Sequence, residues 1–378
     1  MQSLLLVFAT LSGGLIQESI REPERDDPWV HHRSRLHLAS KSEDEVLGNS
    51  RVLWSYEASG FFQYDAAEDP DERAEARVEN FLVRAYRDQW NARVGWQTVS
   101  WGETLGPSLI DVINPRDLRD PSYWLRGDQK LAVPLVLLGW SRDSTVIDAW
   151  ASPMAPQSLL PKEWQNVAIE NNDASRLTEF GVRGGDRVSG WDMKVYAMRH
   201  RARTPAMSLQ MRTMEPFIDA TFPMQSSLGF TVSQAWDNSV LRSEFLQSTS
   251  DDLPAHNLLD FARDQAVVGL DGTWGDHFFW GGELRYSHQK SQLDRDRDLG
   301  WIIAQGQWSL WNERLKPLIH LMQRVQHHDA YQRYEVTGQI KTAWEIGLAW
   351  EAFQSSPQGY FTRLRAYDRL GLTAHWRF

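Results

Sequence analysis

The chain contains no cysteine, no long apolar run and no excess of positive charge. Without cysteine, disulfide bridges and thiolate metal sites are excluded. No stretch approaches the roughly 18 consecutive apolar residues that a membrane-spanning helix needs, so a helical membrane protein is excluded as well. The 40 Lys and Arg residues are outnumbered by 50 Asp and Glu, and the resulting net charge of -10 argues against a protein that binds nucleic acid.

The end of the sequence shows what is present instead. Leu370, Leu372, Trp376 and Phe378 occupy one side of a strictly alternating pattern, and polar or small residues occupy the other. Such alternation predicts a β-strand between two different environments. A terminal Phe preceded by apolar residues at every second position resembles the signal by which outer-membrane β-barrels are recognised for insertion. These four residues are therefore the candidate assembly signal, and the barrel-assembly machinery is a predicted partner.

Composition agrees with a barrel. The apolar content is 42%, yet the mean hydropathy is -0.51. A barrel places only alternate residues against lipid, so a polar average is expected. The 19 Trp and 10 Tyr fit the aromatic girdles of such barrels. A soluble β-sandwich would show the same alternation, but strands of about ten residues with Trp near both ends favour the barrel.

The chain repeats one kind of unit, an alternating run of about ten residues followed by a polar break. We therefore predict an all-β fold, a transmembrane antiparallel β-barrel of about 16 strands, within a range of roughly 14 to 18. The expected strands are Arg51–Tyr64, Ala76–Asp88, Trp90–Thr98, Gln129–Trp140, Ser144–Trp150, Arg176–Gly185, Gly190–Ala202, Leu228–Trp236, Ser239–Ser248, Asp264–Trp274, His277–His288, Gly300–Trp311, Leu315–Gln326, Gly338–Ala352, Gln358–Tyr367 and Leu370–Phe378. His31–Ala39 looks like an extra strand that would make the number odd.

Connections between the strands alternate in length. Short turns are expected at Asp237-Asn238, Gly275-Asp276 and Asn312–Arg314, and longer charged loops at Thr249–Arg263, Gln289–Leu299 and His327–Thr337. Since the C-terminus of such a barrel is periplasmic, this places the short turns in the periplasm and the long loops outside.

The N-terminus has the order of a secretory signal, a short apolar stretch followed by small residues, although a positive n-region is missing. We predict a signal peptide over residues 1–14, a periplasmic or lumenal segment over residues 15–50 and the barrel over residues 51–378. The predicted location is the outer membrane of a Gram-negative bacterium, in contact with its lipid and lipopolysaccharide.

If the apolar face of each strand meets lipid, the other face lines the lumen. The predicted pore-lining residues are Arg84, Arg93, Asp192, Lys194, Asp271, Glu283, Arg285, Arg324, Glu345, Arg363 and Arg365. Both signs are present, so the lumen is expected to be polar and hydrated. These charges either guide a solute, as charged rings do in pores, or simply pair with one another.

One stretch, Ser100–Pro121, breaks the rhythm of the strands. It is too long and too apolar for an ordinary surface loop, which would gain nothing from that much apolar surface. We expect it to fold into the barrel and narrow it, with a short helix between Pro107 and Pro115. The predicted constriction residues are Trp101, Glu103, Asp111, Asn114, Arg116 and Asp117.

Two motifs in this stretch carry a family resemblance. Ser100-Trp101-Gly102-Glu103 followed by Asn114-Pro115-Arg116-Asp117, with Phe180-Gly181-Val182-Arg183 later, resembles an uncharacterised family of proteobacterial outer-membrane β-barrels known only as a domain of unknown function. The resemblance covers much of the chain, and alginate-export and porin-like barrels are more distantly similar. It implies envelope transport, with an RND-type exporter or a periplasmic protein as a partner.

An enzyme is not expected. No Gly-x-Ser-x-Gly nucleophile motif accompanies the scattered histidines, and no metal site or cofactor is predicted. Two functions remain: a porin-like channel that passes hydrophilic or amphiphilic solutes, including as the outer component of an export system, or a plugged barrel with a structural or interaction role. Ion conductance distinguishes them.

Overall fold

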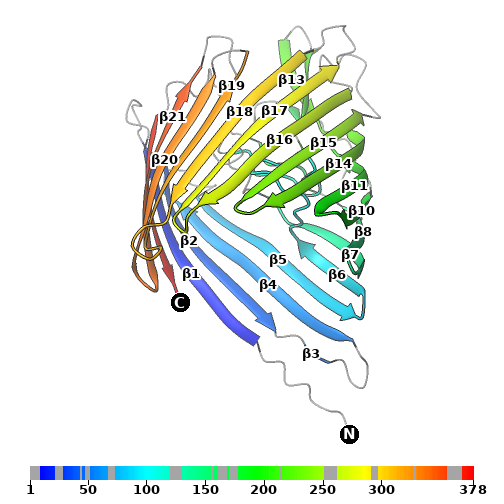
Figure 1. Cartoon of the computed structure of the whole chain (residues 1–378). Coiled ribbons are helices and arrows are strands. Elements are labelled where there is room, and N and C mark those ends of the chain that lie inside the picture. Colours follow the sequence, from blue (N-terminus) through cyan, green and yellow to red (C-terminus); the bar gives the residue numbers. More distant parts are fainter. Residues whose placement is uncertain are drawn as a thin grey trace. The chain divides into compact units, whose positions relative to one another are not determined.

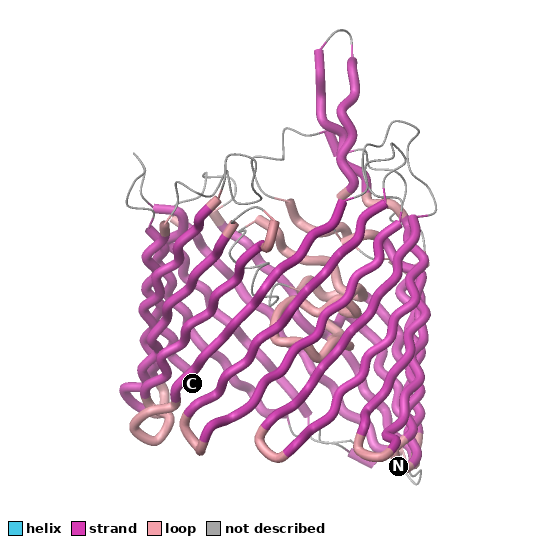
Figure 2. Tube along the Cα trace, turned by 45° about the horizontal axis from the view of Figure 1, so that its top comes forward, coloured by secondary structure: helices cyan, strands magenta, loops and turns pink. Residues whose placement is uncertain are grey.

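The computed structural model describes residues 9–21, 29–42, 45–46, 52–66, 73–119, 130–154, 156–160, 168–169, 178–203, 205–212, 215–250, 262–290, 297–326, 329–355 and 368–378. Within these ranges the chain forms strands, turns and loops, and Figure 2 shows no helix among them. No described helix is therefore long and apolar enough to cross a membrane.

Eighteen strands of the described residues form one closed antiparallel β-barrel. The first strand, β1 (Ala9–Arg21), pairs with the last, β22 (Arg369–Arg377), from Gly14 opposite Arg377 to Arg21 opposite Leu370. The backbone of Phe378 adds a bond in each direction with Gly13. Closure gives the backbone groups of both terminal strands hydrogen-bond partners, which a membrane-spanning sheet needs.

The chain comprises two compact units, and each is described by itself. Figure 1 labels most of their strands. Unit 1 contains Met1–Ala85, Asp271–Gly282 and Trp301–Phe378. Besides β1 and β22, its strands are β2 (Trp29–Ser42), β3 (Glu45–Val46), β4 (Leu53–Asp65), β5 (Ala74–Arg87), β18 (Arg297–Trp308), β19 (Leu315–Arg324), β20 (Ala330–Lys341) and β21 (Trp344–Gln354). The first residues of β18 and the last of β5 belong to unit 2.

Unit 2 contains Tyr86–Leu270 and Glu283–Gly300. Its strands are β6 (Trp90–Gln97), β7 (Val133–Arg142), β8 (Thr145–Ser152), β9 (Ala168–Ile169), β10 (Glu179–Val188), β11 (Trp191–Arg201), β12 (Ala206–Arg212), β13 (Glu215–Thr221), β14 (Met224–Trp236) and β15 (Ser239–Ser250), with parts of β16 (Ala262–Trp274) and β17 (Phe278–Lys290). Strands β12 and β13 form a hairpin that β9 joins in parallel, a small sheet separate from the barrel.

Short turns join the strands where the sequence predicted them. Trp236 pairs with Ser239, which leaves Asp237-Asn238 as a two-residue turn. Asp237, Gly275 and Asn312 have φ of 43°, 61° and 55°, in the left-handed region that Gly, Asn and Asp adopt most readily. Turn chemistry is local, so it could be read from the sequence.

The barrel has 18 strands rather than about 16, and the N-terminus accounts for part of the difference. Strands β1 and β2 lie before residue 51, where the sequence placed a signal peptide and an N-terminal segment, so the predicted start of the barrel at Arg51 is too late. The expected strand His31–Ala39 lies within β2. Strand β1 escaped notice because Gln17 and Ser19 interrupt its apolar alternation. Signal cleavage within residues 1–14 stays a prediction.

A second correction lies near the C-terminus. The expected loop His327–Thr337 is largely strand β20, and the expected strand Gly338–Ala352 contains the turn between β20 and β21. Charged residues within β20 made the segment look like a loop, although Arg333 is buried in contact with Glu335 and Glu351. The expected strand Gln358–Tyr367 lies outside the described residues.

Side chains alternate between two faces along the strands. In β14 the exposed Leu228 and Phe230 share one face, and the buried Ser227 and Thr231 share the other. The face that carries the exposed apolar side chains is called the outer face below, and the opposite face the inner face. Polar residues are thus more enclosed than apolar ones, the reverse of a soluble sandwich.

Candidate functional site

The chain between β6 and β7, described over residues 98–119 and called the β6–β7 segment, packs against the inner face of unit 2. Its apolar side chains Trp101, Ile110 and Ile113 are at most 2% exposed. They lie in a cluster with buried residues of β7, β8, β11, β15 and the segment itself, namely Val99, Val133, Leu135, Leu137, Trp150, Tyr196, Met198 and Leu246. The rings of Trp101 and Trp150 meet edge to face at 6.5 Å. Burial of this apolar surface holds the segment to the strands.

The tip of the segment, Glu103–Pro107, is anchored by two buried carboxylates. Glu244 of β15 accepts hydrogen bonds from the backbone N–H of Glu103 at 2.9 Å and of Leu109 at 2.8 Å, and from the hydroxyl of Ser108. Glu283 of β17 accepts from the N–H groups of Leu105 and Gly106. Both carboxylates are 3% exposed. Bonds to an ionised acceptor are the strong kind, so the tip is fixed mainly by charge-assisted bonds.

Two cations complete the anchoring of the tip. Arg285 of β17 donates to the carbonyl of Pro107 and pairs with Glu283 at 2.8 Å. Lys194 of β11 pairs with the side chain of Glu103, and the hydroxyl of Ser233 donates to the same carboxylate. Burial by itself raises the pKa of Glu103, but the hydrogen bond and charge of Lys194, with help from Ser233, lower it overall. Glu103 is therefore a carboxylate at neutral pH.

A glycine explains how the tip closes on itself. A Cβ on Gly102 would occupy the space of the Ser108 side chain, so the residues that flank the tip lie against each other. Only glycine allows this close approach. The tip is a loop of five residues, Glu103 to Pro107, and the residues on either side of it, Gly102 and Ser108, are in contact.

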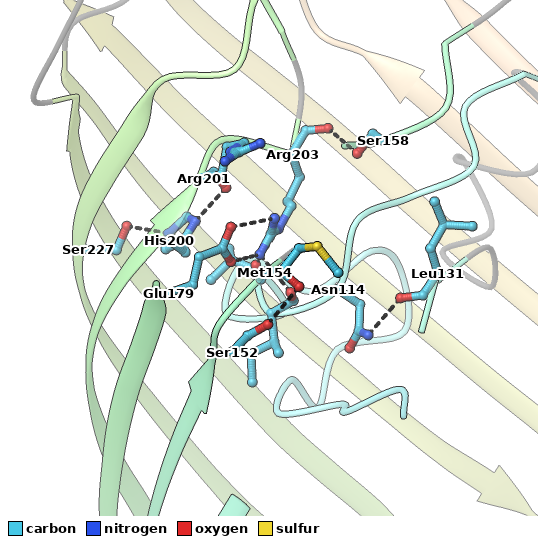
Figure 3. Close-up of polar contacts among 12 residues, drawn as sticks. Asn114, Leu131, Ser152, Met154, Ser158, Glu179, His200, Arg201, Arg203 and Ser227 are labelled. Carbon is cyan, nitrogen blue, oxygen red and sulfur yellow. Dashed lines mark hydrogen bonds and ion pairs between the residues drawn. The ribbon is translucent and has the colours of Figure 1, made fainter. Parts of the chain in front are cut away.

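Beyond the tip, Arg203 and Glu179 hold the next part of the segment (Figure 3). The guanidinium of Arg203 donates to the carbonyls of Val112 and Ile113, each at 2.6 Å, and pairs with Glu179 at 2.5 Å. Glu179 is completely buried and its partner nearly so. Removing either charge would leave the other buried and unpaired, which is costly.

Asn114 ties the same part of the segment to both flanking strands. Its Oδ1 accepts from the N–H of Val99 at 2.7 Å, and its Nδ2 donates to the carbonyls of Gln97 and Leu131. Figure 3 shows the bond to Leu131. A buried asparagine that satisfies three backbone groups specifies one path for the chain.

The predicted short helix between Pro107 and Pro115 is wrong, since residues 98–119 contain none. Within the predicted helix, the N–H of Leu109 donates to Glu244, and the carbonyls of Val112 and Ile113 accept from Arg203. These backbone groups therefore have tertiary partners without a helix.

The remaining constriction residues lie in the same segment. Asp111 is buried and pairs with Lys130. Asp117 is buried and pairs with Arg119 at 2.7 Å. The pKa of Arg116 is lowered, mainly by burial. The negative charge of Asp111 acts to raise this pKa, and the positive charges of Arg285 and Arg203 lower it further. Trp101, Glu103, Asp111, Asn114, Arg116 and Asp117 are thus gathered in one segment, and their role in narrowing a passage stays a prediction.

The predicted pore-lining residues divide between the two units. Arg93, Asp192, Lys194, Glu283 and Arg285 lie in unit 2, and the structure brings Asp192 within 3.3 Å of Lys194. Arg84, Asp271, Arg324 and Glu345 lie in unit 1. Arg363 and Arg365 lie outside the described residues. Whether any of them lines a passage stays a prediction.

Within unit 1, three of the four predicted lining residues form ion pairs with nearby side chains. Arg84 pairs with Glu57 at 2.5 Å, Arg324 with Asp329 at 3.3 Å, and Glu345 with Arg377 at 3.6 Å. For Arg84, Arg324 and Glu345, the structure therefore agrees with the alternative in which the charges of the polar face pair with one another.

The residues that sequence reasoning missed are Glu244, Glu179 and Arg203. Glu244 stands in the expected strand Ser239–Ser248, on the same face as the apolar Leu246. A charge among residues of a buried face is the signal that could have identified it. Glu179 is the first residue of β10 and Arg203 lies two residues after the end of β11, where no local pattern distinguishes them from residues of a polar loop.

The residues of the candidate assembly signal lie on the outer face of β22. Leu370, Leu372, Trp376 and Phe378 are 37 to 54% exposed, and the rings of Trp376 and Phe378 lie 5.2 Å apart. Their recognition by the assembly machinery stays a prediction. Among the described residues, no group of three or more His, Cys, Asp or Glu is placed to hold a metal ion.

Comparison with known proteins places the fold. No family model matches the sequence, and no curated protein matches it either. Solved structures do match. OpdK of Pseudomonas aeruginosa, solved with vanillate, has a TM-score of 0.62 at 8% identity, over 98% of each chain. OccAB3 of Acinetobacter baumannii has a TM-score of 0.60 at 10% identity over 98% of each chain. OmpT, an outer membrane protein of Vibrio cholerae in its trimer form, has a TM-score of 0.55 at 11% identity, over 98% of this chain and 99% of that chain. This chain has the fold of outer-membrane β-barrels.

Proposed function

We propose that the chain is a porin-like channel of a Gram-negative outer membrane that passes hydrophilic or amphiphilic solutes past the β6–β7 segment. The observation that carries the proposal is the anchoring of the tip, Glu103–Pro107, to the inner face of β11, β14, β15 and β17. A segment attached to that many strands of the inner face narrows the space that a solute crosses.

The polar anchoring of the tip fits a passage. None of the residues Glu103–Pro107 belongs to the apolar cluster, and the tip is held by two carboxylates, a lysine and an arginine. Glu103 keeps about a quarter of its side chain exposed, at 27%. Charged groups that remain partly hydrated beside a narrow passage act on the solutes that cross it.

The wider setting follows from the same proposal. The outer face meets outer-membrane lipid and lipopolysaccharide, the C-terminal strand is read by the barrel-assembly machinery, and the protein is a transporter without catalytic activity. A role as the outer component of an export system, with an RND-type exporter or a periplasmic protein, agrees with the family resemblance. The second candidate, a plugged structural barrel, is favoured by the close ion pairing in unit 1.

The decisive test is single-channel conductance in a planar bilayer. The variant lacks Glu103–Pro107 and joins Gly102 directly to Ser108, which already lie in contact, so the strands and the apolar cluster stay in place. Glu313→Gln, in the short turn between β18 and β19 and 78% exposed, serves as the control. We expect steady conductance of the wild type, a higher conductance of the deletion and wild-type values for the control.

Silence of both the wild type and the deletion in correctly folded, heat-modifiable protein would reject the channel and favour the plugged barrel. Equal conductance of wild type and deletion would keep the channel but reject the tip as its narrow point.

A further inference from the structure

Two tryptophans in neighbouring short turns of unit 1 differ from every other apolar side chain in their exposure. Trp274, the last residue of β16, is 80% exposed, and Trp311, in the turn between β18 and β19, is 76% exposed. No other large apolar side chain that the structure describes is more than 65% exposed. The two turns lie side by side, because the N–H of Ser309 donates to the carbonyl of His277 at 2.7 Å. We call Trp274 and Trp311 the exposed tryptophan pair.

The surface above the pair is the apolar outer face. Trp274 follows the exposed Leu270 at an even spacing along β16, so the two share that face. Trp308 shares the outer face of β18 with the exposed Ile302 in the same way. Its ring packs on that of Phe278, the first residue of β17, at 4.6 Å. The pair therefore stands where an apolar surface meets the turns.

The backbone of the second turn is strained in a way that directs Trp311 away from the strands. Trp311, Asn312 and Glu313 have φ of 52°, 55° and 65°, three successive residues in the left-handed region. Asparagine adopts this region readily, whereas a bulky residue such as tryptophan does so rarely. Strain of this kind is concentrated at functional sites, where it serves the placement of a side chain.

The surroundings of the pair are both polar and apolar. The turns expose Asp276, His277, Asn312, Glu313 and Arg314. A tryptophan ring loses free energy in water, and its N–H and the charged neighbours lose hydrogen bonds among acyl chains. The headgroup layer of a membrane satisfies both requirements, which is why tryptophan gathers there.

The extent of the aromatic surface favours lipid over a docked protein. A docking patch is bounded by polar residues, whereas here exposed aromatic residues recur at the turn end of unit 1 as far as β22. The rings of Trp344 and Trp376 stack at 6.1 Å, and Phe378 is 54% exposed. Trp344 and Trp376 lie against each other and are only 44% and 37% exposed, so the pair extends further from the sheet than they do.

We propose that Trp274 and Trp311 insert into the phospholipid headgroup layer of the periplasmic leaflet and anchor this end of unit 1 at the membrane surface. The inference rests on the membrane location and orientation under Proposed function, in which the short turns face the periplasm. It goes beyond them by assigning the exposure of the pair, and the strained turn that holds Trp311, to one lipid layer.

Fluorine resonances of the full chain test the proposal with the tryptophans in place. The protein is labelled with fluorotryptophan and reconstituted in phospholipid nanodiscs. Trp274→Phe and Trp311→Phe each remove one resonance and so assign the pair. Trp350→Phe assigns a control ring on the outer face in the middle of β21, which is 42% exposed. Phenylalanine keeps an apolar ring at each position, so all three variants should fold.

Line broadening is compared for three paramagnetic probes: a nitroxide on the lipid headgroup, a nitroxide at the end of an acyl chain, and a gadolinium chelate in water. We expect the headgroup nitroxide to broaden both resonances of the pair about threefold more than either other probe does, since tryptophan prefers the interface. The control resonance of Trp350 should be broadened most by the acyl-chain nitroxide.

Three results would overturn the proposal. Strongest broadening of the pair by the chelate would mean that the rings lie in water, and strongest broadening by the acyl-chain nitroxide would place them in the hydrocarbon. Weak broadening by all three probes would mean that protein covers the pair. If the chain does not fractionate with the outer membrane, the location fails and the anchor with it, whereas a barrel that is in the membrane but has a water-facing pair rejects the anchor alone. Conductance plays no part in this test.

Discussion

Replacing Glu244 and Glu283 with glutamine should release the tip of the β6–β7 segment. Each carboxylate accepts hydrogen bonds at both of its oxygens. In glutamine one of these positions becomes an amide donor that faces another donor, so each substitution removes at least one bond. A bond to a charged acceptor contributes about 1.5 to 3 kcal/mol net. At the lower value, each substitution changes the ratio of anchored to released tip about tenfold.

Hydrogen exchange measured by mass spectrometry in detergent follows this release directly. The peptide that contains Leu105, Gly106 and Leu109 should exchange about tenfold faster in each single variant, and about a hundredfold faster in the double variant if the two anchors act independently. Glu351→Gln is the matched control. Glu351 is an equally buried carboxylate at 4% exposure, but it bonds Arg333 and Tyr331 in unit 1.

Two outcomes would refute the reasoning. Wild-type exchange of the tip in the double variant would mean that the carboxylates do not hold it. Equal acceleration in Glu351→Gln would mean that the loss of any buried carboxylate loosens the whole barrel, and the effect would say nothing about the tip.

Three further predictions concern the same segment and the C-terminus. In Gly229→Val the added Cβ would lie 2.6 Å from the side chain of Ile110, so we expect the free energy of unfolding to fall by about 1 to 3 kcal/mol. Gly184 has open space around it, so Gly184→Val should lower the free energy of unfolding much less. The folded pKa of Glu103 lies below its ordinary value of 4.5, so its ion pair with Lys194 contributes stability above that pH and loses it as the pH falls through the folded value. After correction for the intrinsic exchange rate at each pH, the protection of the tip amides should therefore fall in acid more in the wild type than in Glu103→Gln, and equal protection profiles would contradict this. Phe378→Ser should reduce the amount of heat-modifiable barrel in the outer membrane, and normal accumulation would argue against the terminal signal.

The alternation of single strands is the part of the fold that the sequence determined by itself. Strands such as β6, β14 and β22 bury one face and expose the other with period two, so Trp90, Val94 and Leu372 could be assigned to the outer face from spacing alone. The short turns were equally readable, because an Asp or Gly with positive φ is a local requirement.

Where a strand breaks its own pattern, only the tertiary structure decided its place. Strand β1 carries Gln17 and Ser19 on its outer face, and β20 carries Arg333 and Glu335 on its inner face, so each looked like something other than a barrel strand. Pairing with β2 and β22, and with β19 and β21, placed them in the sheet.

The anchoring of the β6–β7 segment is the clearest case of this division. The sequence singled out Trp101, Glu103 and Asn114, because a long apolar stretch with paired prolines is unusual between two strands. It could not identify Glu244 and Glu283 as the acceptors for backbone N–H groups of the tip, since these bonds span more than 130 residues of chain. Local patterns record which face a residue occupies. A contact between residues so far apart depends on how the strands are ordered around the sheet, and only the folded chain sets that order.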